Sequence, residues 1–284
     1  MNPTYDIAIN LISDLLSWII VLGLVGLFAL SRTSRFRRQL FNFFGLTRST
    51  PKIHVYMSRV NVKPGGATMI EGEDWPTFAG PVVSAREFIV LPHLERLFRT
   101  ALLDKIPDAI RDLLTSRQPS LARIDIFFHP SPSSMSEVSD GAVVFVGGSL
   151  VNIGTRYYQR TLSLVEIDYE GHEVVVTRGS LKGVRIKPTS ETITIEGGKR
   201  PAHDLGIIER IQDNENKRIA IIAAGTGSNG AMAAVLYLAD HWQELHSQFY
   251  VNNRSNFAII IECPNRRIEE KGYLHPVKRS EVTV

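Results

Sequence analysis

The chain has 284 residues, of which 44% are hydrophobic and 21% are charged, and it contains no long tract of Ser, Gln, Glu or Pro. This composition excludes a wholly disordered protein and provides enough apolar side chains for one large globular domain. The formal net charge is +3, but much of the excess follows one apolar segment, so it does not indicate a nucleic-acid partner. The only cysteine, Cys263, lacks a second thiolate for a disulfide or a metal site, and we expect no bound metal.

Residues 11–30 read LISDLLSWIIVLGLVGLFAL and predict one transmembrane helix. At 1.5 Å per residue the segment spans about 30 Å, which is the thickness of the hydrocarbon core of a bilayer. Asp14 lies near the outer end, where its carboxylate can reach the headgroups, and Trp18 is placed near an interface. A cleaved signal peptide would carry basic residues before the apolar run and a small-residue cleavage site after it, and the sequence shows neither.

The charges that flank the apolar segment predict its orientation. Asp6 precedes it, and basic residues follow it. These are Arg32, Arg35, Arg37, Arg38 and Arg48. The positive-inside rule therefore predicts a single-pass protein of the plasma (inner) membrane, with the N-terminus outside and the bulk of the chain in the cytoplasm. We divide the chain into residues 1–50, a transmembrane helix and basic juxtamembrane segment, and residues 51–284, a cytoplasmic α/β domain. Residues 35–46 can form an amphipathic helix on anionic headgroups or a short solvated linker.

The first part of the cytoplasmic domain predicts strands and one long helix. Short runs of β-forming residues bounded by turn residues predict the strands Lys52–Val60, Ile124–Phe128 and Ala142–Val146. Apolar spacing predicts a helix from Ser84 to about Leu114, which its two prolines, Pro92 and Pro107, should kink or divide. The stretch from Leu162 to Ile195 alternates in the manner of strands and predicts an antiparallel insertion or an extension of the sheet edge.

The last part of the chain has the clearest pattern. It reads as a buried strand Arg218–Ala224, a turn Gly225–Gly230, a helix Ala231–Phe249 and a further strand Phe257–Cys263. Strands that alternate with helices in this way predict an α/β fold with helices on both faces of a parallel, doubly wound sheet. The expected fold is thus one transmembrane helix followed by a Rossmann-like, mostly parallel sheet with a β-rich insertion.

Two glycine-rich turns lie between a predicted strand and a predicted helix. Such turns can bind anions, because the helix N-terminus offers backbone NH groups and a positive dipole. The candidate ligand-binding residues are Gly147, Gly148, Ser149 and Asn152 in the first turn, Gly225, Thr226, Gly227, Ser228 and Asn229 in the second, and Gly80 in a third turn before Pro81. The second turn fits GxGxxG but is not a P-loop, and each turn can also need glycine for geometry alone.

Both turns follow strands of the predicted parallel sheet, so they should open at the carboxyl ends of the strands, where doubly wound folds bind ligands. The loop His129–Ser134 also follows a strand. Among titratable residues we single out Glu87, Asp204, Glu209 and Arg210. Glu87 is the catalytic candidate if the protein is an enzyme, but a glutamate in the first turn of a helix is also favoured by the helix dipole alone. His203 and Asp204 are expected to lie in a loop, and His241 on a helix surface or in packing.

Three segments carry a resemblance to a known group of proteins. They are FAGP (78–81), FVGGSLVN (145–152) and IIAAGTGSNG (221–230). With them the chain resembles membrane-anchored Rossmann-like nucleotide-sensing effectors of bacterial defence systems, of the SLOG-like or CARF-like kind. The resemblance implies that a nucleotide-type small molecule binds the cytoplasmic domain and that the protein acts on the lipid bilayer as a homo-oligomer, since one helix cannot form a pore.

Two other functions fit the same residues. The first is a nucleotide-processing enzyme such as an N-ribosyl hydrolase, in which Glu87 would stabilise or trap an oxocarbenium-like centre. The second is a structural membrane protein whose glycine turns bind no ligand. The sequence identifies no cofactor.

Overall fold

The computed structural model describes residues 31–47, 51–62, 80–83, 89–99, 123–189, 192–195, 198–250, 256–264 and 277–283. The predicted transmembrane segment, residues 11–30, lies outside these ranges. Among the helices within them, none is long and apolar enough to cross a membrane. The anchor, its orientation and the membrane localisation therefore stay predictions.

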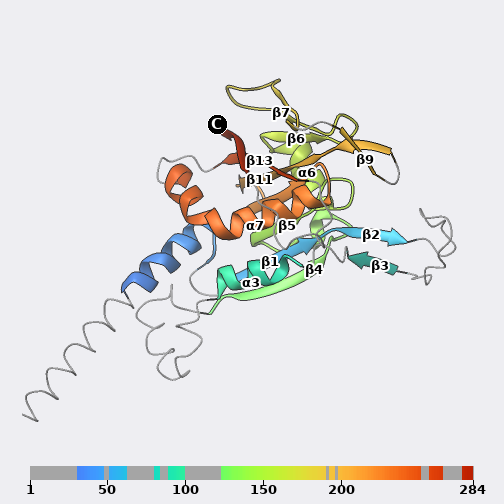
Figure 1. Ribbon diagram of the computed structural model, residues 1–284. Coiled ribbons are helices and arrows are strands. Elements are labelled where there is room, and N and C mark those ends of the chain that lie inside the picture. Colours follow the sequence, from blue (N-terminus) through green and yellow to red (C-terminus); the bar gives the residue numbers. More distant parts are fainter. Residues whose placement is uncertain are drawn as a thin grey trace, which may run out of the picture.

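A seven-stranded sheet forms the centre of the domain, with the strand order β14-β13-β11-β12-β5-β1-β4 (Figure 1). Its strands are β1 (Lys52–Met57), β4 (Asp125–Pro130), β5 (Gly141–Val146), β11 (His203–Asp213), β12 (Arg218–Gly225), β13 (Phe257–Pro264) and β14 (Val277–Thr283). Neighbouring strands among β12, β5, β1 and β4 are parallel. The remaining pairs, β12 with β11, β11 with β13 and β13 with β14, are antiparallel.

The prediction of an α/β fold with a mostly parallel sheet is confirmed, with one correction. Strand β13 runs in the same direction as β12, as predicted, because both are antiparallel to β11. The sequence analysis missed β11, which lies between them and interrupts the parallel order. A short turn joins β11 to β12, and a turn of this length can connect only antiparallel strands. The sheet is therefore mixed rather than doubly wound throughout.

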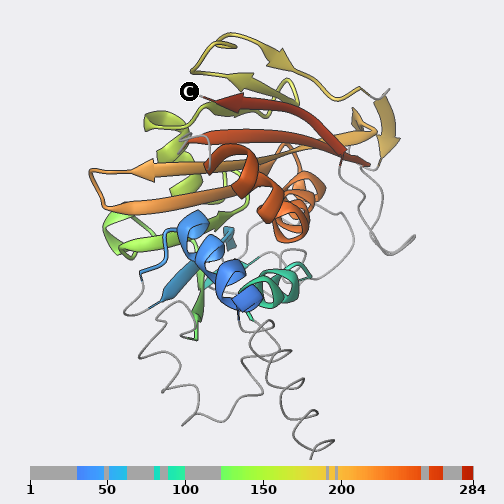
Figure 2. The same cartoon turned by 90° about the vertical axis from the view of Figure 1, so that its left-hand side faces the viewer.

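Different layers cover the two faces of the sheet (Figure 2). On one face lie the helical residues 31–44, α3 (Leu91–Phe98) and α7 (Ser228–Leu245), which is followed by the π-helical turn η3 (His246–Tyr250). On the other face lie α6 (Ile153–Thr161) and the small sheet of β6 (Val165–Asp168), β7 (Glu173–Val176) and β8 (Arg185–Ile186). The small sheet is antiparallel, as the sequence predicted for this stretch.

Two hairpins complete the fold. One pairs β2 (Arg59–Val62) with β3 (Gly80–Val83), and the other pairs β9 (Thr192–Ile195) with β10 (Gly198–Pro201). The loop from β4 to β5 contains one short helix, η2 (Met135–Glu137). Pro92 lies in the first turn of α3, where a proline is tolerated, so α3 begins at the place where the sequence predicted a break. The rest of the predicted helix lies beyond the described ranges.

The helical residues 31–44, called here the arginine helix, belong to the core of the domain. Leu40, Phe43 and Phe44 are fully buried, and the Phe44 ring packs edge to face on Phe98 at 4.8 Å between centroids. Residues 35–46 were expected to face headgroups or to form a solvated linker. They form a helix, but its apolar side packs on protein, because α3 and α7 offer a complementary apolar surface. The core therefore includes residues that the sequence analysis assigned to the juxtamembrane segment.

Gly45 ends the arginine helix in a left-handed conformation with φ of +68°, which favours glycine. Leu46 N then donates to Phe41 O at 2.9 Å, which closes the turn. A Cβ at Gly45 would overlap the side chain of Ile219 on β12, so no other residue fits this position without a shift. The helix end is thus fitted closely to the sheet.

Candidate functional site

The two glycine turns of the sequence analysis leave adjacent strands at the same edge of the sheet. β5 continues into Gly147 and Gly148 and reaches α6, and β12 continues through Thr226 and Gly227 into α7. The strands are parallel neighbours, and Gly147 N donates to Ala223 O at 2.9 Å. The structure therefore brings the two predicted ligand loops side by side. They are called here the β5–α6 loop (147–152) and the β12–α7 loop (225–229).

The helices that follow the two loops lie on opposite faces of the sheet. Tyr158 of α6 packs with Phe145 in the core on one face, whereas Val235 of α7 and Val144 of β5 belong to the core on the other face. Adjacent parallel strands whose helices diverge in this way form a topological switch point, where open α/β sheets place their ligands. The position of the two loops is therefore that of a ligand site in this class of fold.

Asn152 holds the β5–α6 loop against the strand ends. It is fully buried, and its Oδ1 accepts hydrogen bonds from Gly154 N at 3.1 Å and Thr155 N at 3.4 Å. Its Nδ2 donates to Tyr56 O and Val146 O, each at 2.9 Å. With all these protein partners, the Asn152 side chain caps α6 and fixes the loop. The predicted direct contact of Asn152 with a ligand has no support in this geometry.

Two residues that the sequence analysis did not single out lie at the outer part of the β5–α6 loop. Tyr169 OH accepts a hydrogen bond from Ser149 N at 2.8 Å, and a Cβ at Gly148 would overlap that hydroxyl. Burial raises the pKa of Tyr169, so the phenol stays protonated. Arg156 donates from Nε to Ser149 O at 2.7 Å and from Nη2 to Leu150 O at 2.9 Å. The exposed guanidinium of Arg156 thus lies beside the loop and gives it a positive charge.

Strand β11 packs closely against the β12–α7 loop. Thr226 N donates to Leu205 O at 2.9 Å, and Leu205 N donates to the Thr226 hydroxyl at 3.0 Å. A Cβ at Gly227 would overlap the carboxylate of Asp204, and one at Gly230 would overlap Leu205 O. The close approach of β11 is therefore sufficient to explain these glycines. Moreover, Asp204 already brings a negative charge to the start of α7, which is favourable there and would repel a phosphate.

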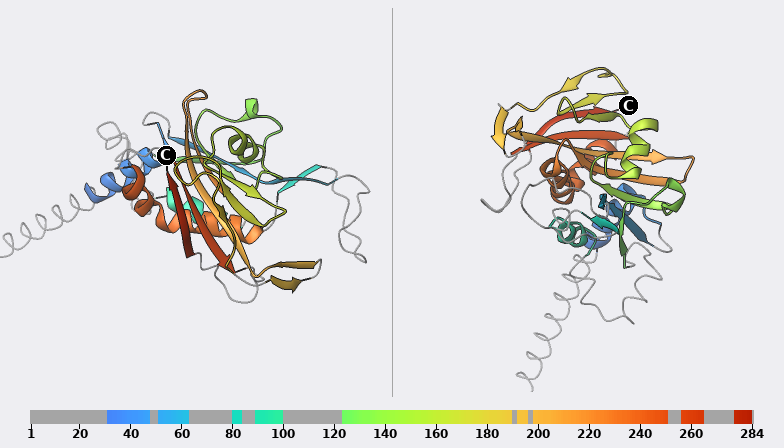
Figure 3. Two further views of the ribbon diagram at one scale, coloured as in Figure 1. Left: turned by 90° about the horizontal axis from the view of Figure 1, so that it is seen from above. Right: turned by 90° about the vertical axis from the view of Figure 1, so that its right-hand side faces the viewer.

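Other predicted site residues lie elsewhere. Gly80 pairs with Val62 in the β2–β3 hairpin, at the end farther from β1, and the hairpin projects beyond the sheet (Figure 3). The structure therefore does not bring Gly80 to the two loops. Glu87 lies outside the described residues. From the loop after β4, Ser131 does reach α6, because its hydroxyl accepts a hydrogen bond from Ile153 N at 2.9 Å.

The titratable candidates on β11 have structural partners. His203 and Asp204 were expected in a loop, but they begin β11, and His203 Nδ1 lies 3.0 Å from Glu262 Oε1. Arg210 is buried and donates from Nε to Phe43 O at 2.8 Å, at the end of the arginine helix. Glu209 accepts hydrogen bonds from Ser163 Oγ and Leu164 N, each at 2.5 Å. Burial raises the pKa of Glu209 to about 7.

The last titratable candidate, His241, lies on α7. Its ring stacks on Tyr237 at 4.2 Å between centroids, and its Nδ1 lies 3.3 Å from Glu244 Oε2. Both partners are one turn away on the same helix. His241 therefore takes part in local packing on the surface of α7, as the sequence predicted. It does not belong to the β5–α6 loop or the β12–α7 loop.

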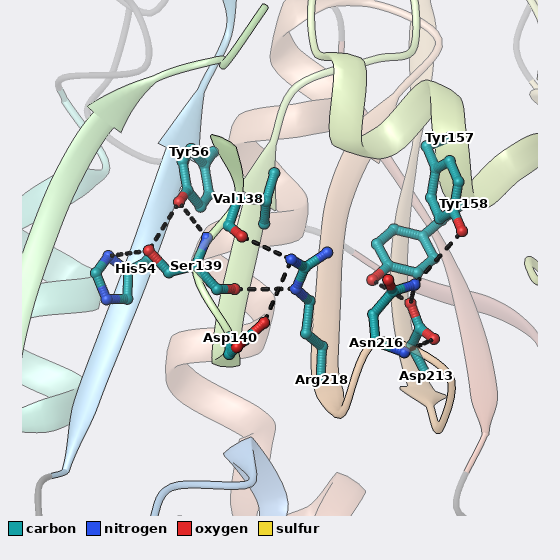
Figure 4. A network of polar contacts seen from close by, with 10 residues as sticks. All are labelled: His54, Tyr56, Val138, Ser139, Asp140, Tyr157, Tyr158, Asp213, Asn216 and Arg218. Carbon is teal, nitrogen blue, oxygen red and sulfur yellow. Dashed lines mark hydrogen bonds and ion pairs between the residues drawn. The ribbon is translucent and has the colours of Figure 1, made fainter. Parts of the chain in front are cut away.

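A second polar cluster lies on the opposite side of β1 from the arginine helix, because Ile53 and Val55 of β1 share a core with that helix. Figure 4 shows His54, Tyr56 and Ser139 of this cluster. His54 Nδ1 is 3.0 Å from His129 Nε2 and 3.2 Å from Ser139 Oγ, and Tyr56 OH donates to Ser139 Oγ at 3.3 Å. The two imidazole planes differ by only 13°, with centroids 5.2 Å apart, and the distance between the two nitrogens is that of a hydrogen bond from one ring to the other.

Burial and the neighbouring His129 lower the pKa of His54, and burial lowers the pKa of His129. Both rings are therefore neutral near pH 7, and hydrogen bonds link Tyr56, Ser139, His54 and His129 in series. The sequence signal for this cluster was present, because histidines and aromatic residues alternate in β1 and β4 and so share a face. Their pairing, however, depends on the register of the two strands, which the sequence does not show.

Arg218 fixes the loop that carries Ser139. Its guanidinium donates to Val138 O at 2.6 Å and to Ser139 O at 3.0 Å, next to the carboxylate of Asp140 (Figure 4). Further along the same edge, Asp213 accepts hydrogen bonds from Tyr158 OH at 2.9 Å and Asn216 Nδ2 at 2.8 Å. Burial alone would raise the pKa of Asp213, but these hydrogen bonds outweigh burial and lower it. This edge of the sheet is thus held by internal polar contacts.

No protein-family model matches the chain, and neither a curated protein nor a solved structure matches it. The resemblance to SLOG-like or CARF-like nucleotide sensors therefore stays a prediction. The two loops thus differ in charge, with the guanidinium of Arg156 beside one of them and the carboxylate of Asp204 against the other.

Proposed function

We propose that this chain is a membrane-anchored sensor whose α/β domain binds a nucleotide-type ligand at the edge where β5 and β12 end. The observation that supports this most directly is the divergence of α6 and α7 from adjacent parallel strands. The anchor is the predicted span of residues 11–30. Because a single span cannot form a pore, the sensor would act on the membrane as a homo-oligomer, and ligand binding would promote its assembly.

Within this edge, the phosphate of the ligand belongs on the side of the β5–α6 loop. Arg156 supplies a positive charge there, and Gly148 and Ser149 are only partly buried. On the other side, Asp204 places a carboxylate against Gly227. A phosphate beside Arg156 gains a charge-assisted hydrogen bond, whereas a phosphate beside Asp204 meets a like charge. The β12–α7 loop would then contact the uncharged part of the ligand.

The test uses the full chain, purified in mild detergent and measured by native mass spectrometry for a co-purified nucleotide. Arg156→Gln should reduce retention of that ligand on the order of tenfold, as expected for loss of one charged hydrogen bond. Arg160→Gln is the matched control, because Arg160 is also exposed and lies one turn further along α6. It should retain the ligand.

Two results would contradict the proposal. One is the absence of any nucleotide-sized adduct, together with no change in melting temperature on adding common mono-, di- and cyclic nucleotides. The other is equal loss of ligand in Arg156→Gln and Arg160→Gln, which would place the phosphate away from the β5–α6 loop. Mass photometry of the same samples should show a larger assembly with ligand than without it.

A further inference from the structure

The arginine helix separates its arginines into two groups. Arg37 is only 2% exposed, and it donates from Nη1 to Phe98 O at 3.1 Å, at the end of α3. Arg32, Arg35 and Arg38 are exposed. They are spaced by three residues, so they share one side of the helix with exposed Asn42. This side is called here the arginine face. Of the five arginines that predicted the membrane orientation, one is structural, three point outward, and Arg48 lies outside the described residues.

The arginine helix carries no acidic residue, and a neighbouring segment adds exposed arginines. Residues 31–47 contain no Asp or Glu. The neighbouring helix α3 exposes Arg96 and Arg99, of which Arg99 pairs with Glu95 at 2.5 Å. The two helices touch through Phe44 and Phe98, so their exposed residues belong to the same side of the domain. The arginine face therefore carries a local positive charge suited to an anionic partner, although α7 on the same side of the domain also exposes Asp240 and Glu244.

The position of the helix in the chain identifies that partner as a membrane surface. The arginine helix begins directly after the apolar segment 11–30. At 1.5 Å per residue, Arg38 lies only about 12 Å beyond Leu30 along a helix, which is within reach of the headgroup layer. A nucleic acid would have to approach in the same narrow space. With residues 11–30 in the bilayer, as proposed above, lipid phosphates would occupy that space.

We propose that the arginine face binds the phosphates of anionic lipid headgroups and so fixes which side of the α/β domain lies against the bilayer. This inference rests on the membrane attachment that is part of the proposed function. It differs from the amphipathic helix considered from the sequence, because the phenylalanines are buried in the domain and only the arginines meet the lipid. The face of the sheet that carries α6 and β6–β8 then points away from the bilayer.

The test places the full chain in nanodiscs made of phosphatidylcholine alone or with phosphatidylglycerol. A fluorophore on Asn42→Cys reports contact through quenching by a headgroup-attached nitroxide lipid. The native Cys263 does not react, because burial raises the pKa of its thiol to about 12. A second probe on Lys182→Cys is the control, because this exposed residue lies in the turn between β7 and β8, on the opposite layer.

We expect the Asn42 probe to be quenched strongly only in the discs with phosphatidylglycerol, and high salt should reverse the quenching. Replacing Arg32, Arg35 and Arg38 by Gln should remove this effect. Each replacement should lower the ratio of docked to released domain by about fivefold. The Lys182 probe should stay bright throughout. Equal or absent quenching of Asn42 in both kinds of disc would overturn the inference alone. Failure of the full chain to enter discs would overturn the membrane attachment as well.

Discussion

The β5–α6 loop and the β12–α7 loop look alike in the sequence but differ in their surroundings. The β12–α7 loop matches the more familiar glycine pattern, yet Leu205 and Asp204 of β11 fill the space around its glycines. The β5–α6 loop matches no named pattern, and it is flanked by the phenol of Tyr169 and the guanidinium of Arg156. A glycine pattern therefore shows only that something approaches the backbone closely. Whether that is a ligand or another strand depends on the neighbours.

The largest effect is expected for Gly227→Glu, which tests whether β11 or a ligand occupies the space beside the β12–α7 loop. The new side chain would place a second carboxylate against Asp204 in a closely packed position. We expect it to destabilise the fold by about 3 kcal/mol or more, measured by urea denaturation. Leu181→Glu, which adds the same charge at an exposed turn, is the control. A Gly227→Glu protein of normal stability that has lost ligand binding would show that the β12–α7 loop is a ligand loop after all.

A second test concerns Glu209, which lies on the same strand as Asp204 but holds Ser163 after α6. Burial raises its pKa from 4.5 to about 7, so the folded state binds more protons than the unfolded state between these values. The free energy of unfolding should therefore fall as the pH rises from about 4.5 to about 7, by up to about 3 kcal/mol from this group.

Glu209→Gln should lack this pH dependence. The partly buried His54 and His129 and the buried His246 have lowered pKa values, so they change stability in the opposite sense as the pH falls below about 6.5. Their contribution is the same in both proteins and cancels in the difference. Urea denaturation of the two proteins at several pH values measures that difference. A constant difference across this range would show that Glu209 is ionised in the folded state.

The smallest effect is expected for Asp204→Asn. Loss of the carboxylate at the start of α7 should cost about 0.5–1 kcal/mol of stability. If the phosphate lies beside Arg156, nucleotide affinity in a binding titration should hardly change, because Asp204 is on the other loop. A marked gain in affinity would mean that the carboxylate had been repelling the phosphate, and that both loops share it. Gly148→Ala is the corresponding substitution in the β5–α6 loop, because its methyl group would overlap the hydroxyl of Tyr169.

Much of the fold could be predicted from apolar runs and turn residues. The elements predicted in this way include β1, β5, β12, β13, α7 and the antiparallel sheet of β6 to β8. Strand β11 was missed because Glu209 and Arg210 lie in its middle and resemble site residues. Both are buried through partners distant in the chain, Ser163 and Phe43, which no local pattern reveals. For the same reason, residues 35–46 were expected to lie on headgroups or to form a solvated linker. The apolar side of the arginine helix packs on protein. Tertiary packing decides whether such an apolar side contacts lipid or protein.

The candidate site could be predicted only in part. The two loops were correctly expected at one edge, because the carboxyl ends of parallel strands meet there. Tyr169 and Arg156 were not expected to flank the β5–α6 loop. Tyr169 comes from the insertion, and its place depends on how that layer folds back over the sheet. The histidine cluster likewise required the register of β1 against β4.

The insertion of β11 between β12 and β13 has a consequence for synthesis of the protein. β11 and β12 form a local hairpin, but the partner that covers the other edge of β11 follows only after α7. Until residues 257–264 leave the ribosome, an apolar strand with unpaired backbone groups is open to other chains. Nascent chains halted after α7 should therefore aggregate with one another, and the completed chain should not, because β13 then closes that edge.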